Sequence, residues 1–221
     1  MEQVAELERR RRAVDDMYEA FVEKGAWSAP EVSASEAARM FQEASEGDNF
    51  PALTFVDVRS AEERRVSIIP GAIDKYAFER AIEDDDARAS LIGDSKSKII
   101  CYCTIGYRSG KYVESMLEKH ECLRGHIFNL RGSILSWTHQ GMPLEEGGDS
   151  SSSGSGRGAM STTTTVHVFG ETWRLQHPAY NAVTFKNLTY ASKLLGAFWS
   201  YSFAPIFDWV RSLVRLIWSS Q

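Results

Sequence analysis

The chain has 221 residues, of which 43% are hydrophobic, enough for one domain with a sizeable core plus additional segments. Three cysteines without paired CxxC motifs argue against a disulfide scaffold or a zinc site and favour a reducing compartment. The net charge is uneven, at −8 over residues 1–160 and +3 over residues 161–221, so an acidic body makes nucleic acid an unfavourable partner.

The N-terminal sequence is acidic and polar, unlike a secretory signal or a transit peptide, so we expect a cytoplasmic protein. Apolar residues recur at helical spacing over residues 3–24 and predict an amphipathic helix, which we assign to residues 1–27. We interpret it as a helix that covers the core, with a partner-binding or coiled-coil role as the alternative. A second helix is expected from Ser33 to about Glu46, because Ser33 and Glu36 have the spacing of a capping box.

Short apolar runs then alternate with helix-like segments. Strands are expected at residues 53–59, 98–103 and 127–130, and helices at residues 76–91, 109–120 and 134–139. This alternation predicts an α/β domain whose central, mostly parallel sheet is flanked by helices, with ligands at the carboxyl ends of the strands.

Residues 99–110 carry the strongest functional signal. A strand brings Cys103 to its end, and a turn with Gly106 and Arg108 follows before the next helix. A thiol acts as a nucleophile in its thiolate form, which a nearby arginine, inward-pointing backbone N–H groups and a helix N-terminus all favour. The alternative is that Cys103 is a small buried hydrophobic residue.

Several motifs occur together, in an order that resembles the single-domain rhodanese family. They are Asp57-Val58-Arg59, Ile69-Pro70-Gly71-Ala72, Cys103-x-x-Gly106-x-Arg108-Ser109, Asn129-Leu130-x-Gly132-x-Ile134-x-x-Trp137 and Gly141-x-Pro143. With the helix at 33–46, the resemblance covers about residues 30–145, and we place the rhodanese domain at residues 28–146.

The resemblance implies a three-layer rhodanese-like fold and a sulfurtransferase. We expect no cofactor, and we expect no metal because the five histidines show no ligand spacing. In that reaction Cys103 takes a sulfane sulfur from a small anionic donor such as thiosulfate, holds it as a persulfide and passes it to cyanide or to a thiol on a small molecule or a protein. Arg108 is expected to hold the shape of the loop and to add positive charge. The substrate-binding residues are expected in the same loop, namely Thr104, Ile105, Gly106 and Tyr107.

Individual positions carry further expectations. Tyr107 is expected to narrow the mouth of the pocket or to stack against the donor, and Asp57 and Arg59 to brace the loop as an ion pair. Ser133 stands where the family commonly has a second glycine, and Ile68 where it commonly has a histidine, and we expect neither to touch the nucleophile.

Cys101 lies two residues before Cys103, so a resolving thiol is an alternative to a core residue there. Cys122 is interpreted as a packing or surface thiol.

Two other functions remain open. Cysteine phosphatases and arsenate reductases of this fold have five residues between the cysteine and the arginine, whereas this chain has four, Thr104 to Tyr107, which disfavours that chemistry. The second alternative is a rhodanese-fold binding module that is tethered to a membrane and has a regulatory role.

The remaining sequence is expected to form a linker and an extension. Residues 147–164 are rich in serine, glycine and threonine and predict a flexible linker. In the extension at residues 165–221, alternation over 166–170 indicates a strand, and residues 191–219 predict amphipathic helices with a wide apolar face. That face would bind a membrane surface, the domain itself or a second copy of the chain.

Overall fold

The computed structural model describes residues 1–25, 27–46, 52–147 and 161–185, and it confirms the predicted α/β architecture. A five-stranded sheet has the order β1-β5-β4-β2-β3, and every pairing within it is parallel. Its strands are β1 (Glu31–Val32), β2 (Leu53–Asp57), β3 (Ile73–Asp74), β4 (Lys98–Tyr102) and β5 (Ile127–Leu130). Because all five strands run in one direction, their carboxyl ends meet at one edge of the sheet.

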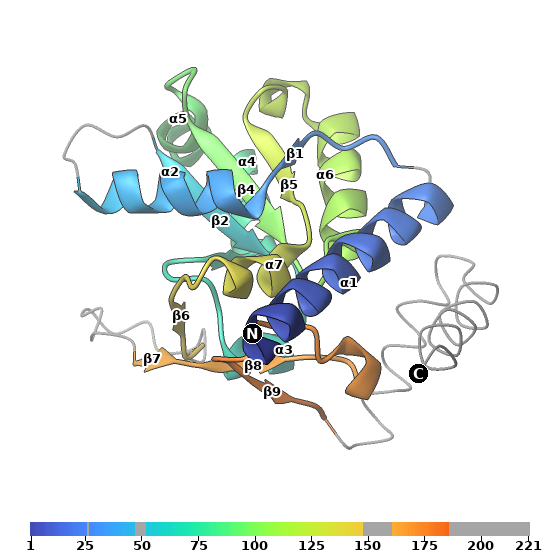
Figure 1. Ribbon diagram of the computed structural model, residues 1–221. Helices are drawn as coiled ribbons and strands as arrows, with labels where there is room; N and C mark the ends of the chain where they lie inside the picture. Colours follow the sequence, from blue (N-terminus) through green and yellow to red (C-terminus); the bar gives the residue numbers. More distant parts are fainter. Residues whose placement is uncertain (26, 47–51, 148–160, 186–221) are drawn as a thin grey trace.

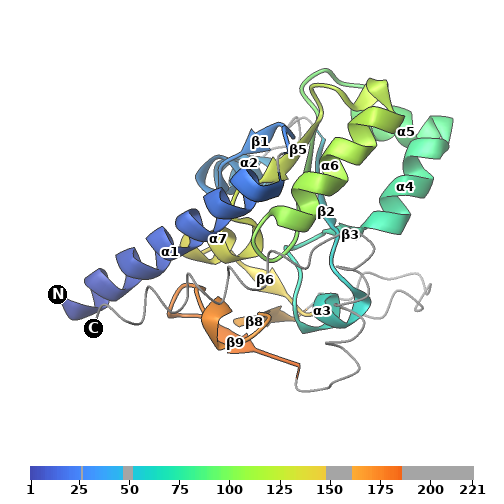
Figure 2. The same cartoon turned by 90° about the vertical axis from the view of Figure 1, so that its right-hand side faces the viewer.

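Helices cover both faces of this sheet (Figures 1 and 2). Along β4, Ile100 and Tyr102 pack into one cluster with residues of α2 and α7, whereas Ile99 and Cys101 pack into another with residues of α1, α4 and α6. This alternation is what a strand buried on both faces requires. The helices are α1 (Glu2–Gly25), α2 (Ala34–Glu46), α3 (Ala61–Val66), α4 (Lys75–Glu83), α5 (Asp85–Ile92), α6 (Tyr107–Lys119) and α7 (Ser133–His139), and short 3-10 turns lie at Glu121–Leu123 and Glu171–Trp173.

The structure divides the predicted helical segment 76–91 into α4 and α5. Asp84 has an extended conformation between them, and its side chain accepts a hydrogen bond from the N–H of Ala87 at 2.8 Å. The side chain therefore caps a new helix, because aspartate satisfies N–H groups that would otherwise lack a partner in the first turn.

The predicted linker is folded at its C-terminal end. Residues 148–160 lie outside the described part of the chain, but β7 (Thr162–Thr163) pairs antiparallel with β6 (Leu144–Glu145). Residues 161–164 therefore belong to the folded structure and not to a linker.

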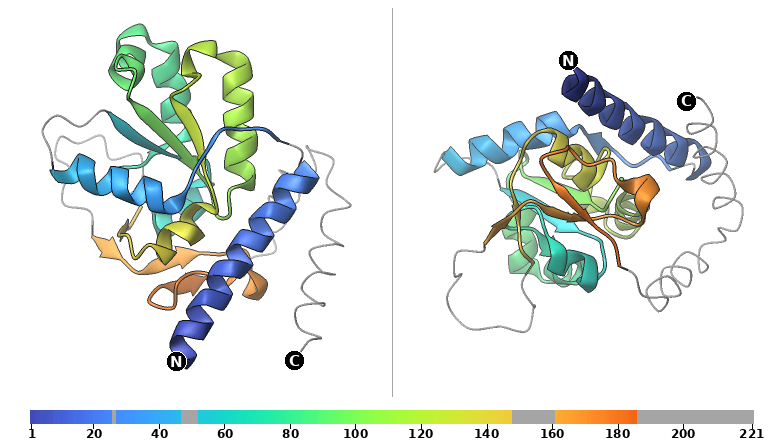
Figure 3. Two further views of the ribbon diagram at one scale, coloured as in Figure 1. Left: turned by 45° about the horizontal axis from the view of Figure 1, so that its top comes forward. Right: turned by 60° about the horizontal axis from the view of Figure 1, so that its bottom comes forward.

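Residues 161–185, which we call the C-terminal cover, fold back against the domain. They contain β8 (Thr165–His167) and β9 (Asn181–Val183), which pair in parallel and lie at the same end of the molecule as α3 (Figures 1 and 3). Val166 and Val168 are completely buried, each in a different core cluster. The cover is also tied to the domain by hydrogen bonds, for example from the Tyr180 hydroxyl to the Met142 carbonyl at 2.6 Å.

The expected membrane-binding region, residues 191–219, lies outside the described residues. Within the described ranges, no helix has both the length and the apolar character that crossing a bilayer requires.

Candidate functional site

The candidate site is formed by the segments that follow three parallel strands. Cys103 directly follows β4, Arg59 lies two residues after β2, and Ser133 lies three residues after β5. Because β4 lies between β2 and β5 in the sheet, the segments that follow these strands converge at its carboxyl edge. Cys103 is only 1% exposed there.

The turn after Cys103 directs a backbone N–H at its sulfur. Gly106 has φ = 110° and donates its N–H to the Cys103 Sγ at 3.2 Å. The carbonyl of Gly106 accepts a hydrogen bond from the Asn129 side chain at 3.1 Å, which holds the turn against β5. Glycine suits this position because its backbone adopts positive φ without a steric penalty.

Arg108 is held by a buried carboxylate that our sequence interpretation did not identify. Its two terminal nitrogens donate to the two oxygens of Glu63 at 2.8 Å each, and the Glu63 side chain is 0% exposed. Thr104 joins the same cluster, since its hydroxyl lies 3.4 Å from Glu63 and 3.3 Å from Arg108. The Ser60-x-x-Glu63 spacing is a capping box, and both of its hydrogen bonds are present.

The charges of this cluster act on the sulfur. Burial alone would raise the pKa of the Cys103 thiol, but the positive charge of Arg108 and hydrogen bonds from Ser109 and Gly106 outweigh it, so the pKa lies below its ordinary value. For Glu63, burial is likewise opposed by Arg108 and by His167, and the carboxyl pKa lies well below its ordinary value. The site therefore favours a thiolate beside a fixed ion pair.

The expected ion pair between Asp57 and Arg59 is present and completely buried. The Arg59 side chain donates to both carboxylate oxygens of Asp57, at 2.6 Å in the shortest contact, and to the carbonyl of Ser67 at 2.6 Å. These bonds fix the segments on either side of α3, the helix that carries Glu63.

Two of the predicted substrate-binding residues direct their side chains into the core. Tyr107 is the first residue of α6, and its ring packs against Phe21 and Trp27 with centroid separations of 5.3 Å to each. The prediction that Tyr107 narrows the mouth of a pocket is therefore wrong. Ile105 is 2% exposed and belongs to the same hydrophobic cluster.

The expectation that Ser133 does not touch the nucleophile is also wrong. Its hydroxyl oxygen lies 3.9 Å from the Cys103 Sγ and accepts the Cys103 N–H at 2.9 Å. Ile68, by contrast, is a buried core residue whose backbone bonds to Glu145.

The C-terminal cover brings two further side chains to the cluster. The Nδ1 of His167 lies 3.5 Å from Glu63 Oε1, and the Phe169 ring lies under the guanidinium of Arg108, 5.0 Å from ring centroid to Cζ. The sequence indicated a strand here through its alternation, but local spacing could not connect the cover with Glu63.

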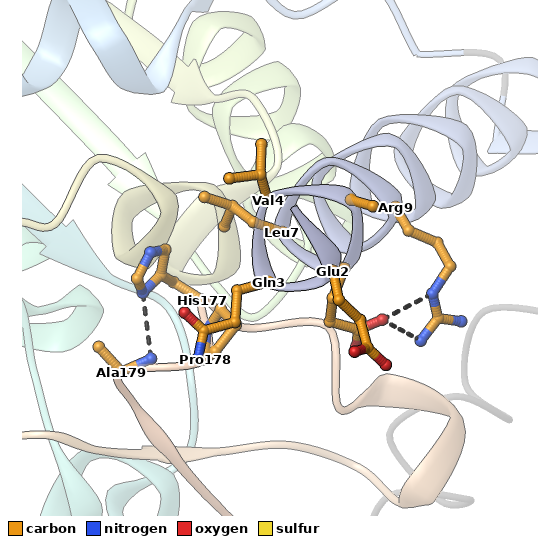
Figure 4. Close-up of a pocket in the computed structure, with 10 residues that line it drawn as sticks. Glu2, Gln3, Val4, Leu7, Arg9, His177, Pro178 and Ala179 are labelled. Atoms are coloured by element: carbon orange, nitrogen blue, oxygen red, sulfur yellow. Dashed lines mark hydrogen bonds and ion pairs between the residues drawn. The ribbon is translucent and has the colours of Figure 1, made fainter.

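The other two cysteines show no comparable arrangement. Cys101 is completely buried, and burial raises the pKa of its thiol, whereas Cys122 is exposed. Within the described part of the chain, no group of three or more His, Cys, Asp or Glu residues could hold a metal ion. A groove lined by the first turns of α1 and by residues 177–179 contains none of the candidate-site residues (Figure 4).

The buried position of Cys103 leads to a prediction about access. Each cysteine of the native protein can be labelled with a bulky maleimide and with the smaller iodoacetamide, and the maleimide rate divided by the iodoacetamide rate reports how open the site is. We expect this ratio to be several-fold lower at Cys103 than at exposed Cys122. Replacing Phe169 with alanine removes the ring that packs against the guanidinium of Arg108 and should raise this ratio at Cys103 only. Peptide mapping of both cysteines measures it, and equal ratios at the two sites in the native protein would contradict the expectation.

The fold and the site define an α/β domain that presents a cysteine at the carboxyl edge of a parallel sheet. The sequence profile of the rhodanese-like domain family matches residues 33–140, so the chain contains a rhodanese-like domain. No curated protein matches the chain.

Solved structures with a similar fold include a thiosulfate sulfurtransferase from Pseudomonas aeruginosa, with 22% identity, a TM-score of 0.44, and coverage of 62% of this chain and 23% of that one. A Rhodopseudomonas palustris protein of unknown function, named a possible tyrosine phosphatase, has 18% identity, a TM-score of 0.42, and coverage of 58% and 93%. A rhodanese-like domain protein from Staphylococcus aureus has 22% identity, a TM-score of 0.31, and coverage of 49% and 90%. Because these TM-scores are below 0.5, the assignment rests on the family match.

Proposed function

We propose that this protein is a sulfurtransferase in which Cys103 is the nucleophile and carries a sulfane sulfur as a persulfide. The observation that supports this most directly is the environment of the Cys103 sulfur. It receives the Gly106 N–H at 3.2 Å and the electrostatic field of Arg108, which together favour a thiolate. The family match at residues 33–140 is compatible with this class of enzyme.

In the first half-reaction, the Cys103 thiolate attacks the outer sulfur of a small anionic donor such as thiosulfate. The new S–S bond forms as the sulfur–sulfur bond of the donor breaks, and sulfite leaves with the bonding electron pair. The negative charge moves to the outer sulfur of the persulfide, where inward-pointing N–H groups of the loop stabilise it. Arg108 contributes long-range positive charge, because both of its terminal nitrogens are already bonded to Glu63.

In the second half-reaction, the thiolate of an acceptor attacks the outer sulfur and becomes a persulfide, and Cys103 leaves as a thiolate. Cyanide would accept the sulfur in the same way and become thiocyanate. The substrates would approach Cys103 at the loop of residues 103–108. The backbone of this loop would face them, because the side chains of Ile105 and Tyr107 point into the core.

Phosphatase or arsenate reductase chemistry is less well supported. Four residues separate Cys103 from Arg108, and the bidentate pair with Glu63 occupies the arginine that would otherwise bind phosphate oxygens. The tethering hypothesis depends on residues 191–219, outside the described part of the chain, and deleting residues 190–221 would test it by membrane pelleting.

Replacing Cys103 with serine is expected to abolish sulfur transfer from thiosulfate to cyanide. The same variant should show no mass gain of one sulfur atom after incubation with thiosulfate, because an alcohol at this position is neither ionised nor a comparable nucleophile. Replacing Cys122 with serine is the matched control, and it should retain both the turnover and the mass gain. If the native protein shows neither with any sulfane donor, the proposed function is wrong.

A further inference from the structure

Ser133 has a backbone conformation that serine rarely adopts. Its φ is 50°, and among the described residues it is the one non-glycine residue with positive φ. Glycines occupy the comparable positions at 71, 106, 125, 132 and 141, where φ lies between 66° and 110°. A side chain in this conformation is strained, and such residues cluster at functional sites. The strain is therefore a reason to ask what the Ser133 side chain does.

The Ser133 hydroxyl is completely buried and surrounded by polar atoms. Its oxygen accepts the N–H of Cys103 at 2.9 Å. It also lies 3.9 Å from the Cys103 Sγ, 3.4 Å from the Ser109 hydroxyl and 3.3 Å from the carbonyl oxygen of Leu130. A hydroxyl has a single proton to donate, so only one of these acceptors can receive it at a time.

The state of the sulfur decides which acceptor is favoured. A thiolate is a stronger acceptor than a carbonyl oxygen because its hydrogen bond is assisted by charge. A thiol, or a sulfur that is bonded to another sulfur, is only a weak acceptor, and the proton then turns to Leu130. The hydroxyl can thus follow the charge on Cys103 by rotation alone.

We propose that Ser133 is a catalytic hydrogen-bond donor that stabilises Cys103 whenever its sulfur is a thiolate. The effect of this hydrogen bond on turnover rests on the proposed function. In the second half-reaction the acceptor thiolate bonds to the outer sulfur, the persulfide bond breaks, and Cys103 leaves with the electron pair. Ser133 then donates to the leaving sulfur, so it accelerates this step more than the first, in which the same hydrogen bond makes the attacking thiolate less nucleophilic.

Other groups also act on the sulfur, and the test must separate Ser133 from them. The charged or titratable groups of the surrounding elements are Arg108 on α6, Glu63 on α3 and His167 on β8, which form one cluster, and the buried Asp57–Arg59 pair that follows β2. Gly106 and Ser109 supply further hydrogen bonds. Replacing Ser133 leaves the charged groups in place, and of the two hydrogen-bonding residues only Ser109 loses a contact, the 3.4 Å approach of its hydroxyl to that of Ser133.

The experiment measures the rate of alkylation of Cys103 by iodoacetamide as a function of pH, in the full chain with Cys122 replaced by serine. Ser133→Gly and Ser133→Ala both remove the hydroxyl, and only glycine also relieves the strain. We expect the midpoint of the pH profile to rise by about one unit in both variants, the size of one hydrogen bond to a charged group. Ser136→Ala, on the same helix, is the control and should leave the midpoint unchanged.

Unchanged midpoints in both Ser133 variants would overturn the proposal. If Ser133→Ala does not fold, Ser133→Gly decides alone, because glycine adopts this φ freely. Alkylation needs no sulfur donor, so the measurement is valid even if the protein transfers no sulfur. Where transfer does occur, single-turnover rates should fall more for the acceptor step than for the donor step, and an equal loss in both steps would contradict the leaving-group role.

Discussion

Replacing Glu63 with alanine is expected to lower the free energy of unfolding by about 3 kcal/mol, the lower end of the usual effect of removing one partner of a buried ion pair, because the Arg108 side chain is 24% exposed. Both Glu63 oxygens bind Arg108 at 2.8 Å, and the Glu63 side chain is 0% exposed. The substitution leaves the guanidinium of Arg108 without its carboxylate. The same Glu63 carboxylate also faces His167 and caps α3 by accepting the Ser60 N–H, so the substitution removes these two contacts as well.

Urea denaturation measures this effect, with Glu43→Ala as the matched control. Glu43 also accepts from an arginine, Arg39 at 2.6 Å, but that pair is exposed on α2. Exposed pairs contribute less than about 1 kcal/mol, so the control should change stability little. Similar losses in the two variants would contradict the view that Glu63 fixes Arg108 and, through it, the loop.

Because the pKa of Glu63 is lowered in the folded protein, its contribution to the free energy of unfolding depends on pH. This pKa is well below the ordinary value of 4.5, since Arg108 and His167 outweigh the opposing effect of burial. A carboxyl group with a lowered pKa in the folded state stabilises the protein above its unfolded pKa, and this stability is lost as the pH falls through the folded pKa. Glu63→Gln should therefore reduce the acid dependence of the unfolding free energy below about pH 4.5, while at neutral pH it should cost stability.

Much of the site could be predicted because it depends on local sequence. A strand that ends in Cys103, followed by Gly106 and Arg108, locates a thiol at the edge of a parallel sheet, and the structure has this order. Glu63 was missed although its capping-box spacing with Ser60 was readable, because a capping pattern does not indicate that the same carboxylate also binds Arg108, 45 residues away.

The incorrect prediction for Tyr107 has a simple physical reason. The helix α6 begins at Tyr107, not after the loop, so Tyr107 and Gly110 lie on one helical face, three residues apart. Both meet Trp27: the Tyr107 ring packs on it at 5.3 Å, and a Cβ at Gly110 would lie 2.5 Å from its ring nitrogen. Contacts of this kind, like those of Ser133 and His167, join segments distant in sequence, and no local pattern reports them.

Gly106→Ala is expected to reduce sulfur transfer on the order of a hundredfold, as the loss of one well-placed backbone donor does in other enzymes. Gly106 has φ = 110°, and a Cβ there would lie 2.5 Å from the Tyr18 ring. That ring cannot easily move, because the Tyr18 hydroxyl is hydrogen-bonded to Glu31 and Asn129. The turn must therefore shift, and the Gly106 N–H leaves the Cys103 sulfur.

The control for this variant separates backbone strain from the clash at the site. Gly71 also has positive φ, at 73°, but a Cβ there would meet no atom within 4 Å. Gly71→Ala should cost about 1–3 kcal/mol of stability through strain alone and should retain sulfur transfer. Gly106→Ala should lose more stability, lose transfer and raise the pH midpoint for alkylation of Cys103. If both variants retained full transfer, the Gly106 N–H would have no role in holding charge at the sulfur, and the thiolate would depend on Arg108, Ser109 and Ser133 instead.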